Sequence, residues 1–226
     1  MNSYKLLYTC GDSWTAGDEL GDIHKDHQPT IKYYQSWPWH LAQNLDIPMV
    51  INEANGGGSN IRIFRKTNKF MLDWIKKGKN PADVLIIVGW TTPERSEIPY
   101  KKRIYRVTIQ NVISYAANFI GRDLLEKYRQ AFYDLYEDDY GIQMQLLYMC
   151  NTRVTATQLG FKYYDFMSLG CDPQFFKDQH PLLENLFYVT FQKKIADEKL
   201  TTLKFGHPTE EGHKFWADLL KKDLIK

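Results

Sequence analysis

Cysteine, long apolar runs and net charge are all scarce in this sequence of 226 residues. Its 3 cysteines, Cys10, Cys150 and Cys171, lack paired spacing, which argues against a disulfide framework and favours a reducing compartment. No stretch approaches the ~20 consecutive apolar residues that span a bilayer, and the first residues form no apolar segment of signal-peptide length. We therefore expect a cytoplasmic or virion-associated protein.

The charges nearly cancel, because 29 Lys and Arg stand against 27 Asp and Glu, for a net charge of +2. This balance gives no electrostatic reason to expect a nucleic acid or a membrane surface as a partner. The hydrophobic share of 43% is ordinary for a globular protein, and a chain of this length buries a substantial core. Since repeats and low-complexity linkers are absent, residues 1–226 are predicted to form a single domain.

Short apolar runs alternate with amphipathic stretches along the chain. Strands are predicted at residues 5–9, 49–51, 84–88 and 161–166. Helices are predicted at 36–45, at 61–77, over most of 124–159 with an interruption near Gly141, and after Pro208 with Thr209 as the N-cap. Residues 96–122 fit neither pattern and are treated as an insertion. The alternation predicts an α/β fold, a three-layer α/β/α sandwich on a parallel sheet, as in flavodoxin-like proteins.

Four loops with unusual composition each follow a position where a strand should end. The first, GDSW (11–14), places a serine at the carboxyl edge of the predicted sheet, where ligand sites of α/β proteins form. Taken alone it also reads as an ordinary turn. The second, GGGSN (56–60), exposes backbone amides but lacks the Lys that a phosphate-binding loop needs.

The other two loops complete the pattern. GWTTPER (89–95) follows the most apolar strand, and GHPT (206–209) precedes the last helix. His207, fixed by the following Pro208, is well placed to act as a general base, although an isolated histidine is more often a surface residue. A sheet of the predicted kind would bring these loops together although Ser13 and His207 lie far apart in sequence.

In these four loops the sequence resembles the short sequence blocks of the SGNH or GDSL hydrolase family. Gly-Asp-Ser at 11–13 matches the first block, with Ser13 in the nucleophile position. Gly57, with Gly58 as the close alternative, matches the glycine whose amide binds the oxyanion. Two positions depart from the family. Thr91 stands where the family has an oxyanion-binding Asn, and Lys204 stands where it has the Asp that precedes the catalytic His. The third and last blocks are also similar to a compact form of the family found in tailed phages.

The resemblance implies a serine esterase that needs no cofactor and no metal. His207 would accept the proton of Ser13 as its hydroxyl attacks an ester carbonyl, while Gly57 and Thr91, with the Ser13 amide, would bind the oxyanion. Lysine at position 204 cannot orient His207. A backbone carbonyl, Asp197 or Glu198 is therefore expected to do so.

The substrate implied is a small-molecule or carbohydrate ester, with an O-acetylated carbohydrate as one example. Trp14 and Trp90 either stack on sugar rings or brace their loops, and Arg95 either holds a substrate carboxylate or pairs with Glu94 or Glu97. His24 and His27 match no closed zinc pattern, so a hydrated loop is expected there. The alternative function is an inactive protein of the same fold that binds a glycan or forms part of a virus particle.

Overall fold

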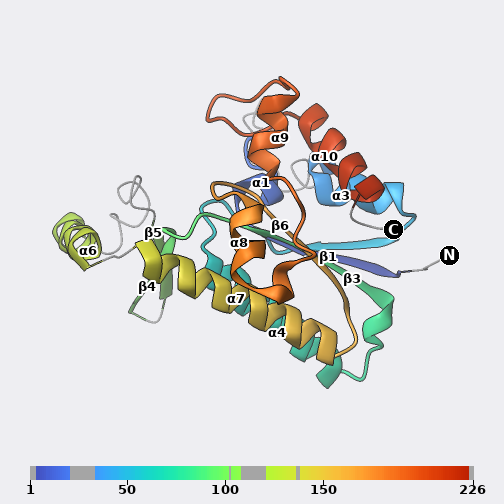
Figure 1. The fold of residues 1–226 in the computed structure, drawn as a ribbon, viewed down its shortest axis with the longest axis horizontal. Coiled ribbons are helices and arrows are strands. Elements are labelled where there is room, and N and C mark those ends of the chain that lie inside the picture. Colours follow the sequence, from blue (N-terminus) through green and yellow to red (C-terminus); the bar gives the residue numbers. More distant parts are fainter. Residues whose placement is uncertain (1–3, 21–33, 102, 108–120, 136–137, 224–226) are drawn as a thin grey trace.

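The computed structural model describes residues 4–20, 34–101, 103–107, 121–135 and 138–223 (Figure 1). The strands are β1 (Leu6–Cys10), β2 (Met49–Asn52), β3 (Val84–Trp90), β4 (Ser96–Tyr100), β5 (Arg103–Val107) and β6 (Lys162–Met167). The helices are α1 (Ser13–Ala16), α3 (Trp37–Asn44), α4 (Asn60–Lys76), α6 (Arg122–Leu135), α7 (Asp138–Gln158), α8 (Pro173–Gln179), α9 (Phe191–Asp197) and α10 (Glu210–Asp223), with short 3₁₀ turns at Pro81–Asp83 and Pro181–Leu183.

A parallel sheet with the strand order β2-β1-β3-β6 forms the centre of the protein. Its middle strands β1 and β3 are buried along their whole length, which explains why both read as continuous apolar runs. The chain leaves β1 for β2 on one side and then returns to β3 on the other. In sheets of this topology, ligand sites form beyond the carboxyl ends of the two strands where the direction reverses. The predicted α/β sandwich and its four strands are confirmed.

Helices cover both faces of the sheet, so that the protein has three layers (Figure 1). On one face, α3, α9 and α10 enclose a core rich in aromatic rings, where Trp216 stacks on Phe191 at a centroid distance of 4.6 Å. On the other face, α4 and α7 pack against each other and over β1 and β3. The high aromatic content of the sequence thus serves the interior to a large extent.

Two predictions of local structure need correction, and the expected insertion gains a description. Gly141, near which an interruption was expected, lies inside α7, and residues 136–137 between α6 and α7 lie outside the described part. The hydroxyl of Thr209 is buried without a hydrogen-bond partner, so this side chain does not cap α10. In the expected insertion, β4 and β5 form an antiparallel hairpin apart from the main sheet, joined to α4 by an ion pair of 2.9 Å between Arg65 and Glu97. Residues 108–120 lie outside the described part.

Candidate active site

Ser13 is the first residue of α1, directly beyond the carboxyl end of β1. The preceding Asp12 is fully buried and caps this helix, because its carboxylate accepts the Trp14 amide at 3.1 Å. The same oxygen accepts the Ser168 hydroxyl at 2.9 Å. A side chain at Gly11 would collide with Thr15, so the turn that presents Ser13 needs glycine there. The serine is therefore held by a rigid, hydrogen-bonded turn.

His207 lies in a tight loop that leads into α10. The His207 carbonyl accepts the Leu203 amide at 2.7 Å, and a bridge between Thr202 and Pro208 closes the loop. The imidazole Nδ1 lies 2.7 Å from a carboxylate oxygen of Glu19. An ionised carboxylate can only accept hydrogen bonds, so Nδ1 carries the proton and Nε2 is left as the basic atom.

Glu19 is the acid that the sequence analysis did not find. Besides His207, its two oxygens accept the Phe205 amide, each at 3.1 Å, so that one carboxylate fixes both the imidazole and the loop that carries it. Its backbone has φ 68°, a left-handed conformation that is uncommon for a residue with a side chain. The turn after α1 supports this conformation, since the Asp18 amide donates to the Ser13 carbonyl at 3.0 Å.

Neither Lys204 nor Glu198 contacts His207. Lys204 is exposed, with its ammonium 5.3 Å from the centroid of the Phe205 ring. Glu198 forms an ion pair of 2.6 Å with Lys194 on α9. The expectation of a backbone carbonyl, Asp197 or Glu198 as the orienting group is therefore wrong, and position 204 has no part in orienting the imidazole.

Ser13 and His207 are brought to the same region by the Glu19 contact. The ring of Trp14, next to Ser13, has its centroid 6.5 Å from that of His207. The Ser13 hydroxyl makes no hydrogen bond to His207 in this structure. In proteins without bound substrate, such contacts between nucleophile and base are often long.

The glycine loop after β2 lies against the turn that presents Ser13. A side chain at Gly58 would stand 2.8 Å from the Gly11 carbonyl oxygen, so only glycine permits this approach. The Gly58 amide donates to the Asn55 carbonyl at 2.9 Å and is thereby occupied. Within the described residues, the Gly57 amide has no acceptor, and its φ of 64° requires a left-handed backbone. Of the two glycines, Gly57 has the amide that is free to bind an anion.

Asn60 connects the glycine loop to the loop after β3. Its side-chain oxygen accepts the Thr91 amide at 2.9 Å, and its nitrogen donates to the Thr91 carbonyl at 2.9 Å. Both residues are buried, and the Thr91 hydroxyl has no hydrogen-bond partner. The role of Thr91 in binding an oxyanion stays a prediction. The sequence alone does not indicate this role for Asn60, because the pairing depends on tertiary contact.

The two tryptophans predicted as sugar-stacking candidates lie in the core. Trp14 packs edge-on against Phe191 at 5.1 Å, and Trp90 is fully buried and donates its indole N–H to Asp165 at 3.0 Å. Neither ring is exposed for stacking on a substrate, so the tryptophans brace the loops instead. Arg95 pairs with Asp12 at 3.5 Å, rather than with Glu94 or Glu97, and its charge is thereby balanced.

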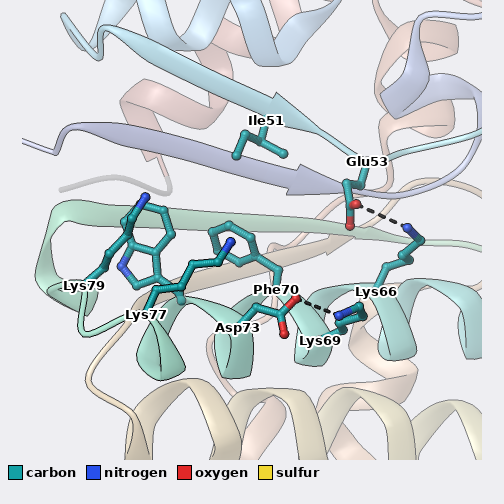
Figure 2. Close-up of a pocket in the computed structure, with 9 residues that line it drawn as sticks. Ile51, Glu53, Lys66, Lys69, Phe70, Asp73, Lys77 and Lys79 are labelled. Atoms are coloured by element: carbon teal, nitrogen blue, oxygen red, sulfur yellow. Dashed lines mark hydrogen bonds and ion pairs between the residues drawn. The ribbon is translucent and has the colours of Figure 1, made fainter.

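A lysine-lined hollow of about 270 Å³ lies elsewhere, between β2 and α4 (Figure 2). Ion pairs join Lys66 to Glu53 at 3.2 Å and Lys69 to Asp73 at 2.7 Å. The other oxygen of Glu53 accepts the buried Tyr8 hydroxyl at 3.0 Å. None of the predicted site residues lines this hollow, and its carboxylates are already paired, so we assign it no part in the candidate site.

Within the described ranges, there is no group of three or more His, Cys, Asp and Glu side chains arranged to hold a metal ion. The segment with His24 and His27 lies outside those ranges. No helix in the described part of the chain combines the length and apolar character needed to cross a bilayer.

His213, next to the candidate site, is buried as a neutral imidazole. Its Nδ1 accepts the amide of Trp37 at the start of α3, at 3.1 Å. Burial, reinforced by the nearby His40 and His207, lowers the pKa of His213 to about 3. Since the unfolded chain takes up this proton near pH 6.5, the free energy of unfolding should fall as the pH drops from 6.5 toward 3.

The contribution of His213 to this slope reaches about 1.4 kcal/mol per pH unit. Urea unfolding of His213→Asn between pH 4 and 7 is expected to show a correspondingly flatter dependence, because asparagine does not titrate but can still accept the Trp37 amide. His180→Asn, a change at an exposed histidine, serves as the control and should keep the wild-type slope. Equal slopes for wild type and His213→Asn would contradict the buried neutral state.

Comparison with solved structures places the chain among proteins with the fold of lipolytic esterases. It is similar to the esterase EstA from Pseudoalteromonas sp., with a TM-score of 0.52 and 8% identity over 97% of this chain and 96% of the other. It is also similar to TesA, with a TM-score of 0.53 and 11% identity over 97% and 98% of the two chains. A member of the lipolytic G-D-S-L family from Veillonella parvula gives 0.50 and 10% over 98% of each chain. These likenesses establish a shared fold.

At the level of sequence, residues 18–181 match DUF6071, described as a family of unknown function, and the chain belongs to this family. No curated protein matches the chain. The matched segment includes Glu19, Gly57 and Thr91, whereas Ser13 and His207 lie outside it.

Proposed function

We propose that this protein is a serine ester hydrolase of the SGNH type, with Ser13 as nucleophile, His207 as general base and Glu19 as the residue that positions the base. The observation that carries the proposal is the 2.7 Å contact between Glu19 and Nδ1 of His207, which leaves Nε2 basic at the loop that lies near Ser13. The fold supports the reaction class, because similar structures include an esterase and a lipolytic protein.

The reaction follows from these groups. Nε2 of His207 accepts the Ser13 proton as the hydroxyl oxygen bonds to the ester carbonyl carbon, and the carbonyl π electrons move to oxygen. The Ser13 and Gly57 amides stabilise this oxyanion, each donor being worth about 10²–10³ in rate. The intermediate then expels the alcohol oxygen, which takes the proton from His207. Water repeats the sequence on the acyl-enzyme, releasing the carboxylic acid and restoring Ser13.

Glu19 acts through His207. Its negative charge stabilises the imidazolium that forms in each half-reaction, and its hydrogen bond keeps the ring in one orientation and one tautomer. Lys204 stands where the family has the acid that orients the catalytic histidine. In the proposed mechanism Glu19 takes over the role of that acid.

The test is hydrolysis of an activated acetate ester together with labelling by a fluorophosphonate. We expect turnover by the wild-type protein and one adduct, located at Ser13 by peptide mass spectrometry. Absence of hydrolysis across a panel of acyl esters, with no adduct at Ser13, would refute the esterase. The alternative would then be an inactive glycan-binding or virion structural protein, which a glycan array would separate.

A further inference from the structure

The lysine-lined hollow between β2 and α4 is bordered by one continuous stripe of α4 (Figure 2). The stripe comprises positions 66, 69, 70, 73, 74 and 77, which follow the helical spacing of three and four residues. Another face of α4 packs on α7, where Asn68 donates to the Thr152 hydroxyl at 3.2 Å. The stripe therefore lies on a face of α4 that is turned toward β2.

Three apolar side chains line the hollow. Ile51 projects from β2 and is 39% exposed, and Phe70 and Trp74 face it from α4. The Phe70 ring is held in place by stacking on the buried ring of Tyr8 at a centroid distance of 3.9 Å. The volume of the hollow is about 270 Å³, whereas an engineered cavity of about 150 Å³ takes up benzene. The hollow therefore has room for one large apolar side chain.

The hollow also carries an unbalanced positive charge. Its walls contain four lysines and two carboxylates, which leaves a net charge of +2. The carboxylates pair with Lys66 and Lys69, whereas Lys77 and Lys79 form no ion pair within the described part of the chain. The dipole of α4 supplies about half a negative unit charge at this end of the helix. That is too little to balance two lysines, so a positive potential remains there.

The pKa of the Asp73 carboxyl reflects this potential. A hydrogen bond from Lys69 and the positive charges of Lys77 and Lys76 lower this pKa below its ordinary value. A carboxylate of a ligand placed beside Lys77 would be stabilised by the same charges.

The aromatic contacts favour a peptide over a nucleic acid. Proteins bind single-stranded nucleic acids by stacking bases on open aromatic faces. Here one face of Phe70 is covered by Tyr8, and the ammonium of Lys79 lies 4.4 Å from the centroid of the Trp74 ring. The rings therefore support the wall of the hollow and leave little surface for a base.

A membrane surface and a second copy of this chain also fit less well. Peripheral proteins insert a projecting apolar surface into a membrane, whereas the apolar side chains here line a recess. A second copy docked on the same surface would bring two lysine-rich rims together, and like charges across an interface repel.

We propose that the lysine-lined hollow is a docking site for an acidic segment of a partner protein. The segment places one apolar side chain against Ile51 and Phe70 and its carboxylates beside Lys77 and Lys79. Charge complementarity selects the partner, and the apolar contact fixes the position of the segment. Docking does not depend on ester hydrolysis, because none of the proposed catalytic residues lines the hollow.

The test is binding of fluorescein-labelled peptides of the sequence Asp-Glu-X-Glu-Asp, where X is Leu, Ile, Phe or Trp, measured by fluorescence anisotropy. We expect saturable binding to the wild-type protein and an affinity at least about 10-fold lower for Lys77→Glu/Lys79→Glu. Lys193→Glu/Lys222→Glu makes the same change of net charge at exposed lysines of α9 and α10. It is the matched control and should stay within about 2-fold of wild type.

The apolar contact is tested from both sides. A peptide with X as Ser should bind at least about 10-fold more weakly than the peptide with Leu. Ile51→Thr keeps the β-branched shape that suits a strand, so the variant should fold. It is expected to lower the affinity for the Leu peptide by about 3- to 10-fold.

Three results would overturn the proposal. Equal weakening in the two double-lysine variants would show a general attraction between opposite charges. Equal affinity for the Ser and Leu peptides, or absence of binding across all four apolar peptides, would show that the hollow does not recognise such a segment. Tighter binding of oligo(dT) or of phosphatidylglycerol vesicles, lost in Lys77→Glu/Lys79→Glu, would assign the hollow to another class of partner.

Discussion

Replacing Ser13 by alanine is expected to lower kcat for an activated acetate ester by about 10⁴- to 10⁶-fold, the range for loss of a serine nucleophile. Without the hydroxyl no acyl-enzyme forms, and only stabilisation by the neighbouring amides remains. The fold should be preserved, because the Ser13 hydroxyl has no hydrogen-bond partner in the described structure. Ser13 is buried, but removing a hydroxyl that makes no hydrogen bond leaves no partner unsatisfied, so we expect the free energy of unfolding to change by less than about 1 kcal/mol.

The measurement pairs steady-state kinetics with intact-mass detection of the fluorophosphonate adduct. Ser96→Ala, a change at a partly exposed serine on β4, should keep both turnover of a simple acetate ester and labelling. Activity of Ser13→Ala close to wild type, with a normal thermal transition, would mean that a different nucleophile acts.

Replacing Glu19 by glutamine is expected to lower kcat by about 10³- to 10⁴-fold, comparable to the loss when the acid of a serine–histidine–acid set is neutralised. The carboxylate accepts from both His207 and the Phe205 amide, whereas an amide group offers one acceptor and turns a donor toward the other partner. The imidazole then loses either its orientation or the charge that stabilises its protonated form. We expect the effect mainly in kcat.

Two controls distinguish positioning from general damage. Glu198→Gln and Lys204→Asp should both stay within about 2-fold of wild type, since neither side chain contacts His207 and isolated surface changes have small effects. In Glu19→Ala, added formate should restore part of the activity, which a purely structural defect would not allow. Higher activity in Lys204→Asp would show that position 204 supplies the orienting group after all.

Local sequence patterns predicted the strands and the long helices because their burial is periodic or continuous. β1 and β3 read as apolar runs since both faces of each are covered, and Ser13 follows from its place at the end of β1. The smaller helices α8 and α9 escaped notice, although Asp172 and Thr190 cap them and offered a usable signal.

Glu19 could not be found in the same way. Its pairing with His207 depends on a left-handed backbone in the turn after α1 and on a loop 188 positions further along the chain. Nor does sequence show which aromatic side chains face outward. Trp14 and Trp90 occupy loops that favour ligand contact, yet tertiary packing turns both rings into the core. The features that sequence missed are those that depend on contacts between distant segments.

The two contacts of the Glu19 carboxylate, with the His207 imidazole and with the Phe205 amide, join two separate segments of the chain in the proposed reaction centre. Ser13 and Glu19 lie on one short N-terminal segment. His207 lies on a C-terminal loop that is held to this segment by the contacts of the Glu19 carboxylate with His207 and with the Phe205 amide. Local opening of that loop would remove His207 from the proposed site and abolish the hydrolase activity, while the sheet and both hydrophobic cores stayed folded. Activity should therefore vanish at a lower temperature than the global melting transition, with the ring environment of Phe205 reporting the earlier event.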